Sequence, residues 1–255
     1  IEDIQDQVEL ALMRSGDQKV ARDYVLYREQ RSQLRAEKLQ AEALPETSIN
    51  VVLEDGTKQP LDMKRLHTIV NEACQDLEDV SAALILDEAL KNLYDGVSYS
   101  EVNTSLVMTA RTMVERDPNY SYVTARLLMD TIRSEALKFL GVANAATQSE
   151  MQALYGKALA SYITKGIEFE LLAPELANFD LVRLGEALNA NRDLQFTYLG
   201  LQTLYDRYFI HKNEIRFELP QVFFMRIAMG LAAQEEDKNG RAIEFYNLLS
   251  SFDYM

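Results

Sequence analysis

The sequence contains one cysteine, no tryptophan and two histidines in 255 residues. A single thiol, Cys74, can form neither a disulfide framework nor a multi-thiolate metal site within the chain. His67 and His211 stand far apart, with no cysteine or carboxylate at metal-ligand spacing. We therefore expect no metal site, and we expect both histidines to be structural or exposed.

Positive charge is also scarce, because 26 basic residues face 40 acidic ones and the net charge is −14. A general affinity for nucleic acid or anionic membrane is therefore not expected, and a nucleotide would need a local basic pocket. No run approaches the ~20 apolar residues that span a bilayer, and the start IEDIQDQVEL lacks the features of a secretory signal. These absences predict a cytoplasmic protein.

Phosphate-binding loops and catalytic pairs are missing as well. Gly230 and Gly240 are isolated, and neither GxxxxGK[ST] nor GxGxxG occurs. The neighbouring carboxylates Glu235 and Glu236 lie in a charged run, where nothing marks them as a general acid and base. The sequence offers no catalytic residue.

Apolar residues recur at helical spacing over most of the chain, and 47% of all residues are hydrophobic. This content predicts a globular protein with a substantial core. Residues 31–47 are rich in charge and alanine and contain Pro45, which is typical of a helix that frays into a linker. The spacing predicts helices at 2–14, from about 18, at 63–77, at 82–94, from 98 to about 115, and from 122 to 140.

Local signals predict where several of these helices begin and end. Ser98 and Glu101 have capping-box spacing, and Gly141 follows the long apolar helix. Lys165-Gly166 is expected to end the next helix, which carries Met151 to Tyr162 on one face. Tyr205, Tyr208 and Tyr246 are expected to be core aromatics with a polar tip.

Two segments break the helical period. Residues 49–62 place short β-prone runs around Asp55-Gly56, and residues 207–219 do the same around Lys212-Asn213. Pro220 then begins a strongly apolar helix. The predicted fold is mainly α: a helical bundle capped by a β-hairpin, followed by an α-helical domain with a second β-hairpin.

Three blocks in the middle of the chain resemble the ATP-cone, a small nucleotide-sensing domain of ribonucleotide reductases: INVVLEDGTKQPLDMKRLHTIV, LYDGVSYSEVNTSLVMTA and RDPNYSYVTARLLMDTIR. EDIQDQVELAL and VARDYVLYR near the start echo SEVNTSLVMTA and TARLLMDTIR, which is typical of a repeated unit. Residues 196–255, ending in FYNLLSSFDYM, resemble the N-terminal helical domain of the class I ribonucleotide reductase large (alpha) subunit.

The resemblance implies a division into four parts. Residues 1–38 are similar to the C-terminal part of a first ATP-cone, and 39–48 form a linker. Residues 49–141 are similar to a second, complete cone. Residues 142–255 correspond to the N-terminal helical domain, and we expect the fragment to be truncated before the catalytic barrel.

The resemblance also implies an effector site in the second cone. The family places a basic pair before the Asp-Gly turn, where this sequence has Leu53 and Glu54, and Glu54 would repel a triphosphate. Arg65 retains the basic position on the next helix, whereas Ser134 replaces a further basic residue. The cone therefore resembles a degenerate one. The effector-nucleotide candidates are Leu53, Gln59, Asp62, Arg65, Leu66, Tyr99, Val102 and Ser134.

A second interpretation of these residues remains open: Leu53, Leu66 and Val102 are core or interface residues, and Arg65 is a solvated or ion-paired group. By resemblance, ATP or dATP is the allosteric effector of the intact protein, and we expect none bound in this fragment.

The activity implied is reduction of ribonucleoside diphosphates to deoxyribonucleotides. Its partners would be a radical-bearing small (beta) subunit and thioredoxin or glutaredoxin, in a homo-oligomer. The chemistry needs a cysteine pair, so one cysteine excludes catalysis by these residues alone. Three alternatives stay open: an adenosylcobalamin-dependent reductase, a nucleotide-sensing repressor, which would need a CxxC zinc ribbon that this sequence lacks, and a non-catalytic helical module.

Overall fold

Helices dominate the part of the chain that the structure describes, as the apolar periodicity predicted. The computed structural model describes residues 49–53 and 56–253, and these belong to a single unit spanning 49–255. The predicted mainly α fold with small β-hairpins is confirmed. The helices predicted at 2–14 and from about 18, the linker and the partial first cone lie outside the described residues.

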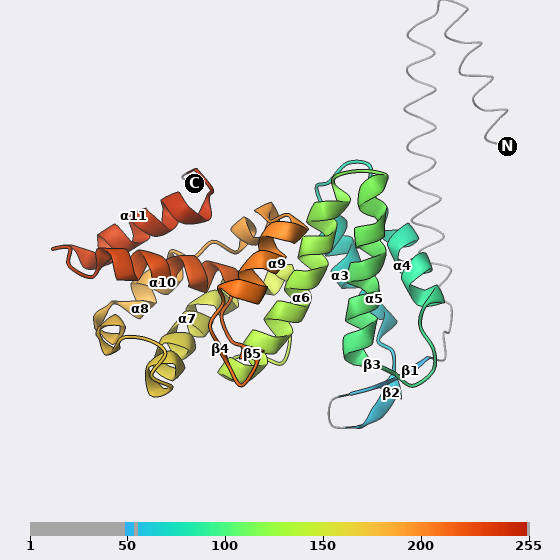
Figure 1. The fold of residues 1–255 in the computed structure, drawn as a ribbon, viewed down its shortest axis with the longest axis horizontal. Coiled ribbons are helices and arrows are strands. Elements are labelled where there is room, and N and C mark those ends of the chain that lie inside the picture. Colours follow the sequence, from blue (N-terminus) through green and yellow to red (C-terminus); the bar gives the residue numbers. More distant parts are fainter. Residues whose placement is uncertain (1–48, 54–55, 254–255) are drawn as a thin grey trace, which may run out of the picture. The chain divides into compact units, whose positions relative to one another are not determined.

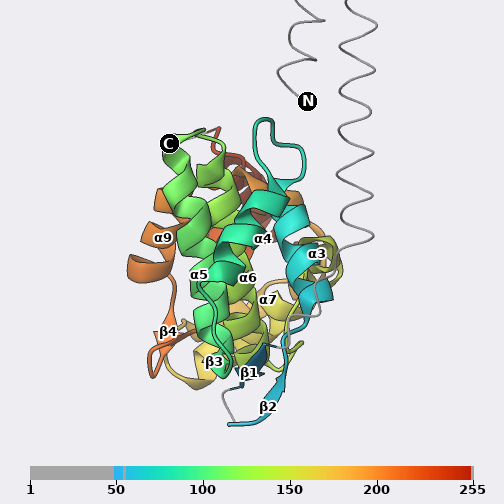
Figure 2. The same cartoon turned by 90° about the vertical axis from the view of Figure 1, so that its right-hand side faces the viewer.

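A three-stranded sheet lies at one end of the first group of helices (Figure 2). Strand β1 (Asn50–Val52) pairs antiparallel with β2 (Lys58–Pro60), which confirms the first hairpin. The Leu53 N–H donates to the Thr57 carbonyl at 2.9 Å, and Gly56 has the positive φ of 81° that the Asp55-Gly56 motif predicted. Strand β3 (Val97–Ser98) pairs parallel with β1 and was not predicted, because two residues are too short to show a strand period.

Helices α3 to α6 pack together above this sheet (Figures 1 and 2). Their starts follow from capping: the Ser98 hydroxyl accepts from the Glu101 N–H while the Glu101 carboxylate accepts from the Ser98 N–H, so the predicted capping box is confirmed. Gly141 ends the longest of these helices with a φ of 72°, as predicted. The bounds are α3 Met63–Cys74, α4 Ala82–Lys91, α5 Tyr99–Thr112, the 3-10 helix η1 Met113–Glu115, and α6 Tyr120–Leu140.

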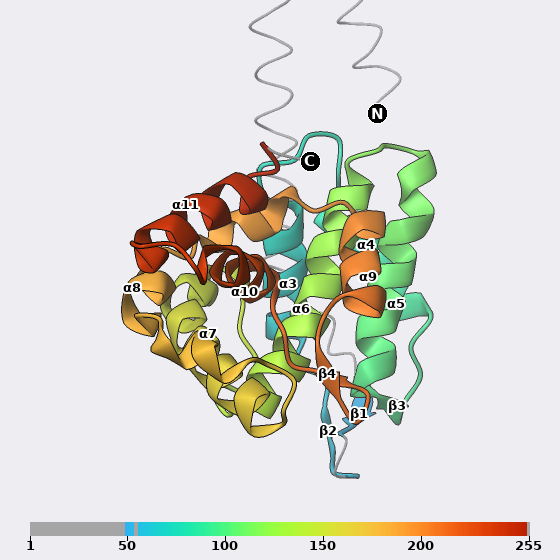
Figure 3. The ribbon, with the colours of Figure 1, turned by 60° about the vertical axis from the view of Figure 1, so that its left-hand side comes forward.

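The second half of the unit is a further set of helices that contacts α6 through α9 and α7. Within it, α10 packs against α7 and α11 (Figure 3), and most of the α10 side chains are buried. The α-helices are α7 Met151–Glu168, α8 Leu181–Glu186, α9 Tyr198–Arg207, α10 Pro220–Ala232 and α11 Lys238–Ser250, with 3-10 helices η2 Gln148–Glu150, η3 Pro174–Asn178 and η4 Ala190–Gln195.

The predicted end of α7 at Lys165-Gly166 was wrong. The helix continues to Glu168, and the residue with positive φ that ends it is Glu170, at 58°. Gly166 serves packing instead, because a Cβ atom there would lie 2.4 Å from the Leu172 side chain. Gly166 therefore allows the Leu172 side chain to approach α7 closely, and it does not end the helix.

The second hairpin is confirmed, but its turn lies one residue further along. Strands β4 (His211–Lys212) and β5 (Ile215–Arg216) pair antiparallel, with Lys212 opposite Ile215. The turn residues are Asn213 and Glu214, with φ values of 51° and 67°. Both central residues of a two-residue I′ turn need positive φ, and Asn213 meets that need more readily than a lysine does.

The three tyrosines differ in burial. Tyr246 is fully buried and Tyr205 is partly buried, as expected for aromatics with a polar tip. Tyr208, by contrast, is 58% exposed, so its assignment to the core was wrong. It follows the last residue of α9, where the chain turns toward the hairpin.

Candidate effector site and buried polar networks

Arg65, the basic residue predicted on the helix after the first hairpin, lies in an ion pair. Its guanidinium donates from one Nη to both carboxylate oxygens of Asp130, at 2.8 and 3.1 Å. Its Nε donates to the Tyr99 hydroxyl at 3.1 Å. The Arg65 side chain keeps 23% exposure, so α3, α5 and α6 together hold a cation that remains accessible from solvent.

The other predicted effector residues divide into core and surface. Leu66 and Val102 are buried, at 1% and 0% exposure. Asp62 is exposed, and its carboxylate caps α3 by accepting from the Arg65 N–H at 2.9 Å. Among the contacts of the described residues, the remaining three candidates form no hydrogen bond with Arg65. Leu53 and Ser134 are partly buried, and Gln59 is exposed on β2.

The structure thus brings Arg65 into direct contact with two other candidates, Tyr99 and Asp62, while Leu66 and Val102 belong to the buried core. That arrangement fits the interpretation of Leu66 and Val102 as core and Arg65 as ion-paired. Whether the eight residues bind a nucleotide stays a prediction.

Asp130 is the site residue that the sequence did not reveal. It is 3% exposed on α6 and faces Arg65. Burial raises the pKa of the Asp130 carboxyl, while the positive charges of Arg65 and Arg133 act against that rise. A carboxylate on the apolar face of the segment LLMDTIR was the available signal, since a buried charge needs a partner.

A buried polar network continues from α6 into the second half of the unit. Arg133 forms an ion pair with Asp193 at 3.4 Å. The Asp193 carboxylate is fully buried and also accepts from the Tyr155 hydroxyl at 2.6 Å and the Gln221 amide at 2.8 Å. The Tyr246 hydroxyl then donates to the Gln221 carbonyl oxygen at 2.7 Å. One carboxylate on η4 therefore links α6, α7, α10 and, through Gln221, α11.

A second buried carboxylate, Glu218, organises the loop before α10. It accepts from the Tyr162 hydroxyl and the Arg226 Nε, both at 2.6 Å. Its other oxygen accepts from the Ile210 N–H at 2.9 Å. Glu218 has no exposed surface, so these contacts replace all of its hydration.

Neither the cysteine nor the histidines form a reactive centre in the described residues. Cys74 is packed against the core, and burial raises the pKa of its thiol to about 11. The thiol is therefore protonated at neutral pH and is a poor nucleophile. His67 is partly buried and His211 is exposed. Within the described part of the chain, no three His, Cys, Asp or Glu side chains are grouped to hold a metal.

Nor does any described helix have both the length and the apolar character needed to cross a membrane.

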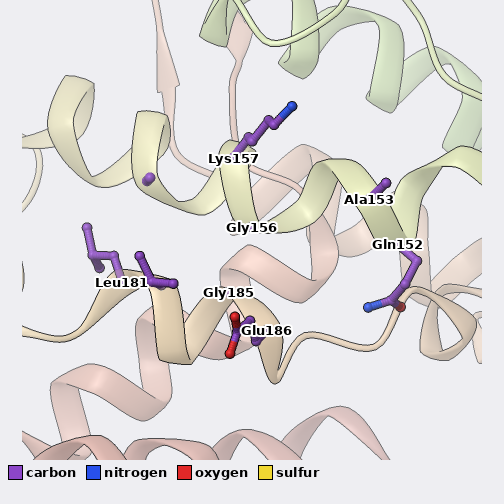
Figure 4. A pocket seen from close by; sticks show the side chains of 9 residues that line it. Gln152, Ala153, Gly156, Lys157, Leu181, Gly185 and Glu186 are labelled. Carbon is purple, nitrogen blue, oxygen red and sulfur yellow. The ribbon is translucent and has the colours of Figure 1, made fainter.

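A groove of about 560 Å³ is lined by residues of α7 and α8, and Arg65 is not among its lining residues. Figure 4 shows Gly156 and Gly185 where these helices approach each other. A Cβ on Gly185 would lie 2.8 Å from the Gly156 Cα, whereas a Cβ on Gly156 would come no closer than 3.7 Å to Gly185. Only a side chain at position 185 would therefore force the backbone to move.

Replacing Gly185 by alanine should accordingly lower the free energy of unfolding by about 1 to 3 kcal/mol, the usual cost of overpacking. Gly156→Ala is the matched control, and it should be neutral or stabilising by up to about 1 kcal/mol because alanine is the better helix former. Urea unfolding of both variants measures the difference. Equal effects would mean that the two helices do not meet as closely as described.

Comparison with known proteins agrees with these observations. The family model of the ATP cone domain matches residues 1–33 and 49–135, and that of the ribonucleotide reductase all-alpha domain matches 194–255. Together these models account for the β-capped helices and for the helices from α9 onward. The chain therefore contains regions that match two domain families, the ATP cone and the ribonucleotide reductase all-alpha domain.

Whole-chain relatives carry the assignment further. The chain is 41% identical over 260 residues to the ribonucleoside-diphosphate reductase subunit alpha of Chlamydia muridarum, covering all of this chain and 24% of the relative. It is 34% identical over 209 residues to the same subunit of Helicobacter pylori (81% and 25%), and 28% identical over 206 residues to the large subunit of Danio rerio (79% and 24%).

The chain belongs to the ribonucleotide reductase large-subunit family, and it matches the N-terminal quarter of these relatives.

Proposed function

We propose that these residues are the regulatory N-terminal portion of a ribonucleoside-diphosphate reductase, in which ATP or dATP bound to cone domains controls overall activity. The intact enzyme would convert ribonucleoside diphosphates to deoxyribonucleotides together with a radical-bearing small subunit and a thioredoxin or glutaredoxin. The match of the ATP cone model to residues 49–135 is the observation that carries this proposal. In this proposal the cone acts by allostery. Effector binding changes the free energy of subunit assembly, and assembly changes the affinity for the effector by the same amount.

Within this proposal, residues 1–38 are the end of a preceding cone, and residues 49–141 form a complete cone with weakened phosphate contacts. Arg65 keeps the basic position that the family has on α3, with Lys64 exposed beside it, and Leu53 occupies a position that the family fills with a cation. A guanidinium already paired with Asp130 binds phosphate less tightly than a cluster of unpaired cations does. We expect weak nucleotide binding by this cone.

The experiment is a calorimetric titration of ATP and dATP into the 255-residue chain and into the double variant Leu53→Lys/Glu54→Arg. Restoring two cations beside the turn and removing one anion should tighten binding at least about tenfold, because charge-assisted contacts are the strong ones. Adding Arg65→Gln to the double variant should abolish that gain.

The matched control applies the same charge change elsewhere. Leu231→Lys/Glu236→Arg alters an exposed leucine on α10 and an exposed glutamate after it, so it should leave nucleotide affinity unchanged. An equal gain in this control would assign the effect to net charge. No binding by the chain or by the restored pair would refute an effector site at residues 49–141.

The names of the relatives favour a diphosphate reductase with a separate small subunit over the adenosylcobalamin alternative, since they are called subunit alpha or large subunit.

A further inference from the structure

Asp130 binds the guanidinium of Arg65, which is the side chain predicted to contact phosphate. Its two oxygens lie 2.8 and 3.1 Å from one Nη of the guanidinium. Carboxylate and phosphate oxygens bind the guanidinium fork in the same way, so they compete for the same N–H groups. The chain thus carries its own anion on the predicted phosphate contact.

Asp130 also has a second cation within reach. Arg133 lies three residues further along α6, hence on the same helix face, and its positive charge acts on the Asp130 carboxyl. The Arg133 side chain is 5% exposed, and its Nε has no hydrogen-bond partner among the described residues. A buried N–H without an acceptor is costly, and a carboxylate on the same face is able to satisfy it.

From these two observations we propose that Asp130 is a two-position carboxylate, which pairs with Arg65 as in this structure and moves to the Nε of Arg133 when the phosphate of a nucleotide takes Arg65. This inference rests on the proposed effector site. It deepens that proposal, because it identifies an internal competitor that lowers the apparent affinity of the cone.

The same exchange would connect the cone to the second half of the unit. Arg133 is the residue that pairs with Asp193 at 3.4 Å, and Asp193 holds Tyr155 and Gln221. A carboxylate at the Nε of Arg133 would share that guanidinium with Asp193, which is bound through Nη2. Occupancy of the cone would then change the charge around Arg133 and, through Asp193, reach α7 and α10, which is the differential contact that allosteric coupling requires.

The test adds Asp130→Asn to the Leu53→Lys/Glu54→Arg variant, in which nucleotide binding is measurable under the proposed function. Removing the competing charge should tighten ATP binding by about tenfold, because the fraction of chains with a free Arg65 rises. Glu135→Gln is the matched control: it removes the same charge from the same helix, where the carboxylate accepts from the Tyr205 hydroxyl and the Arg216 N–H. That control should bind ATP as the double variant does.

A second measurement covers the case in which Asp130→Asn does not fold. In the folded double variant, the Nε–Hε resonances of Arg65 and Arg133 are followed by ¹⁵N NMR as ATP is added, and both should shift in proportion to occupancy.

The outcomes separate the two claims. Binding by the double variant with no gain from Asp130→Asn, or with an Arg133 resonance that does not move, overturns the exchange and leaves the effector site standing. No binding by the double variant overturns the effector site and the exchange with it.

Discussion

Replacing Asp193 by alanine should lower the free energy of unfolding by about 3 to 5 kcal/mol. Its carboxylate has no exposed surface and accepts from Tyr155, Gln221 and Arg133. The alanine would leave a 5% exposed Arg133 cation and two buried donors without their acceptor, and breaking one side of a buried pair costs that much.

Urea unfolding followed by circular dichroism measures this loss as a lower midpoint. Asp206→Ala is the control, because Asp206 is exposed on α9 and accepts only from the Gln202 amide in the described contacts. It should change stability by no more than about 0.5 kcal/mol. A similar small change for Asp193→Ala would mean that the network does not hold these helices together.

Replacing Glu218 by alanine should have an effect of nearly the same size, about 3 kcal/mol or more. The Arg226 guanidinium, the Tyr162 hydroxyl and the Ile210 N–H would lose the acceptor they share. Since Glu218 lies between the second hairpin and α10, the variant should loosen the hairpin first.

Two comparisons sharpen this second prediction. Glu218→Gln keeps an acceptor but removes the charge, so its cost should be smaller than that of the alanine. Glu236→Ala, at an exposed position, should stay within about 0.5 kcal/mol of the parent chain. Hydrogen exchange of the Ile210 amide reports the local loosening directly. An unchanged exchange rate in Glu218→Ala would contradict the proposed role of the carboxylate.

Elements governed by local signals could be predicted from the sequence. The Ser98–Glu101 capping box and the glycine at 141 act within one helical turn, so a few residues contain all the information. The first hairpin belongs to the same group. The turn of the second hairpin was placed one residue too early, because Asn213 suits either central position of a tight turn and only the pairing of Lys212 with Ile215 decides.

Contacts between distant residues could not be predicted. Arg65 and Asp130 lie 65 positions apart, and Tyr155 and Asp193 lie 38 apart. Helical spacing identifies which face of each helix is buried, but it does not say which buried polar groups meet. Strand β3 was missed for the same reason, since its two residues become a strand only by pairing with β1.

The glycine at 166 shows the limit of single-residue signals. It was expected to stop α7, yet the close approach of Leu172 is what favours a glycine there. The end of a helix and a close contact on a helix both favour glycine, and only the surrounding structure shows which of the two applies.

The most direct measurement is a crystal structure of the Leu53→Lys/Glu54→Arg chain with ATP bound. The account predicts phosphate oxygens within about 3 Å of the Arg65 guanidinium, with Asp130 turned toward the Nε of Arg133. A nucleotide bound elsewhere on residues 49–141, or an Arg65 still paired with Asp130 beneath a bound triphosphate, would contradict it.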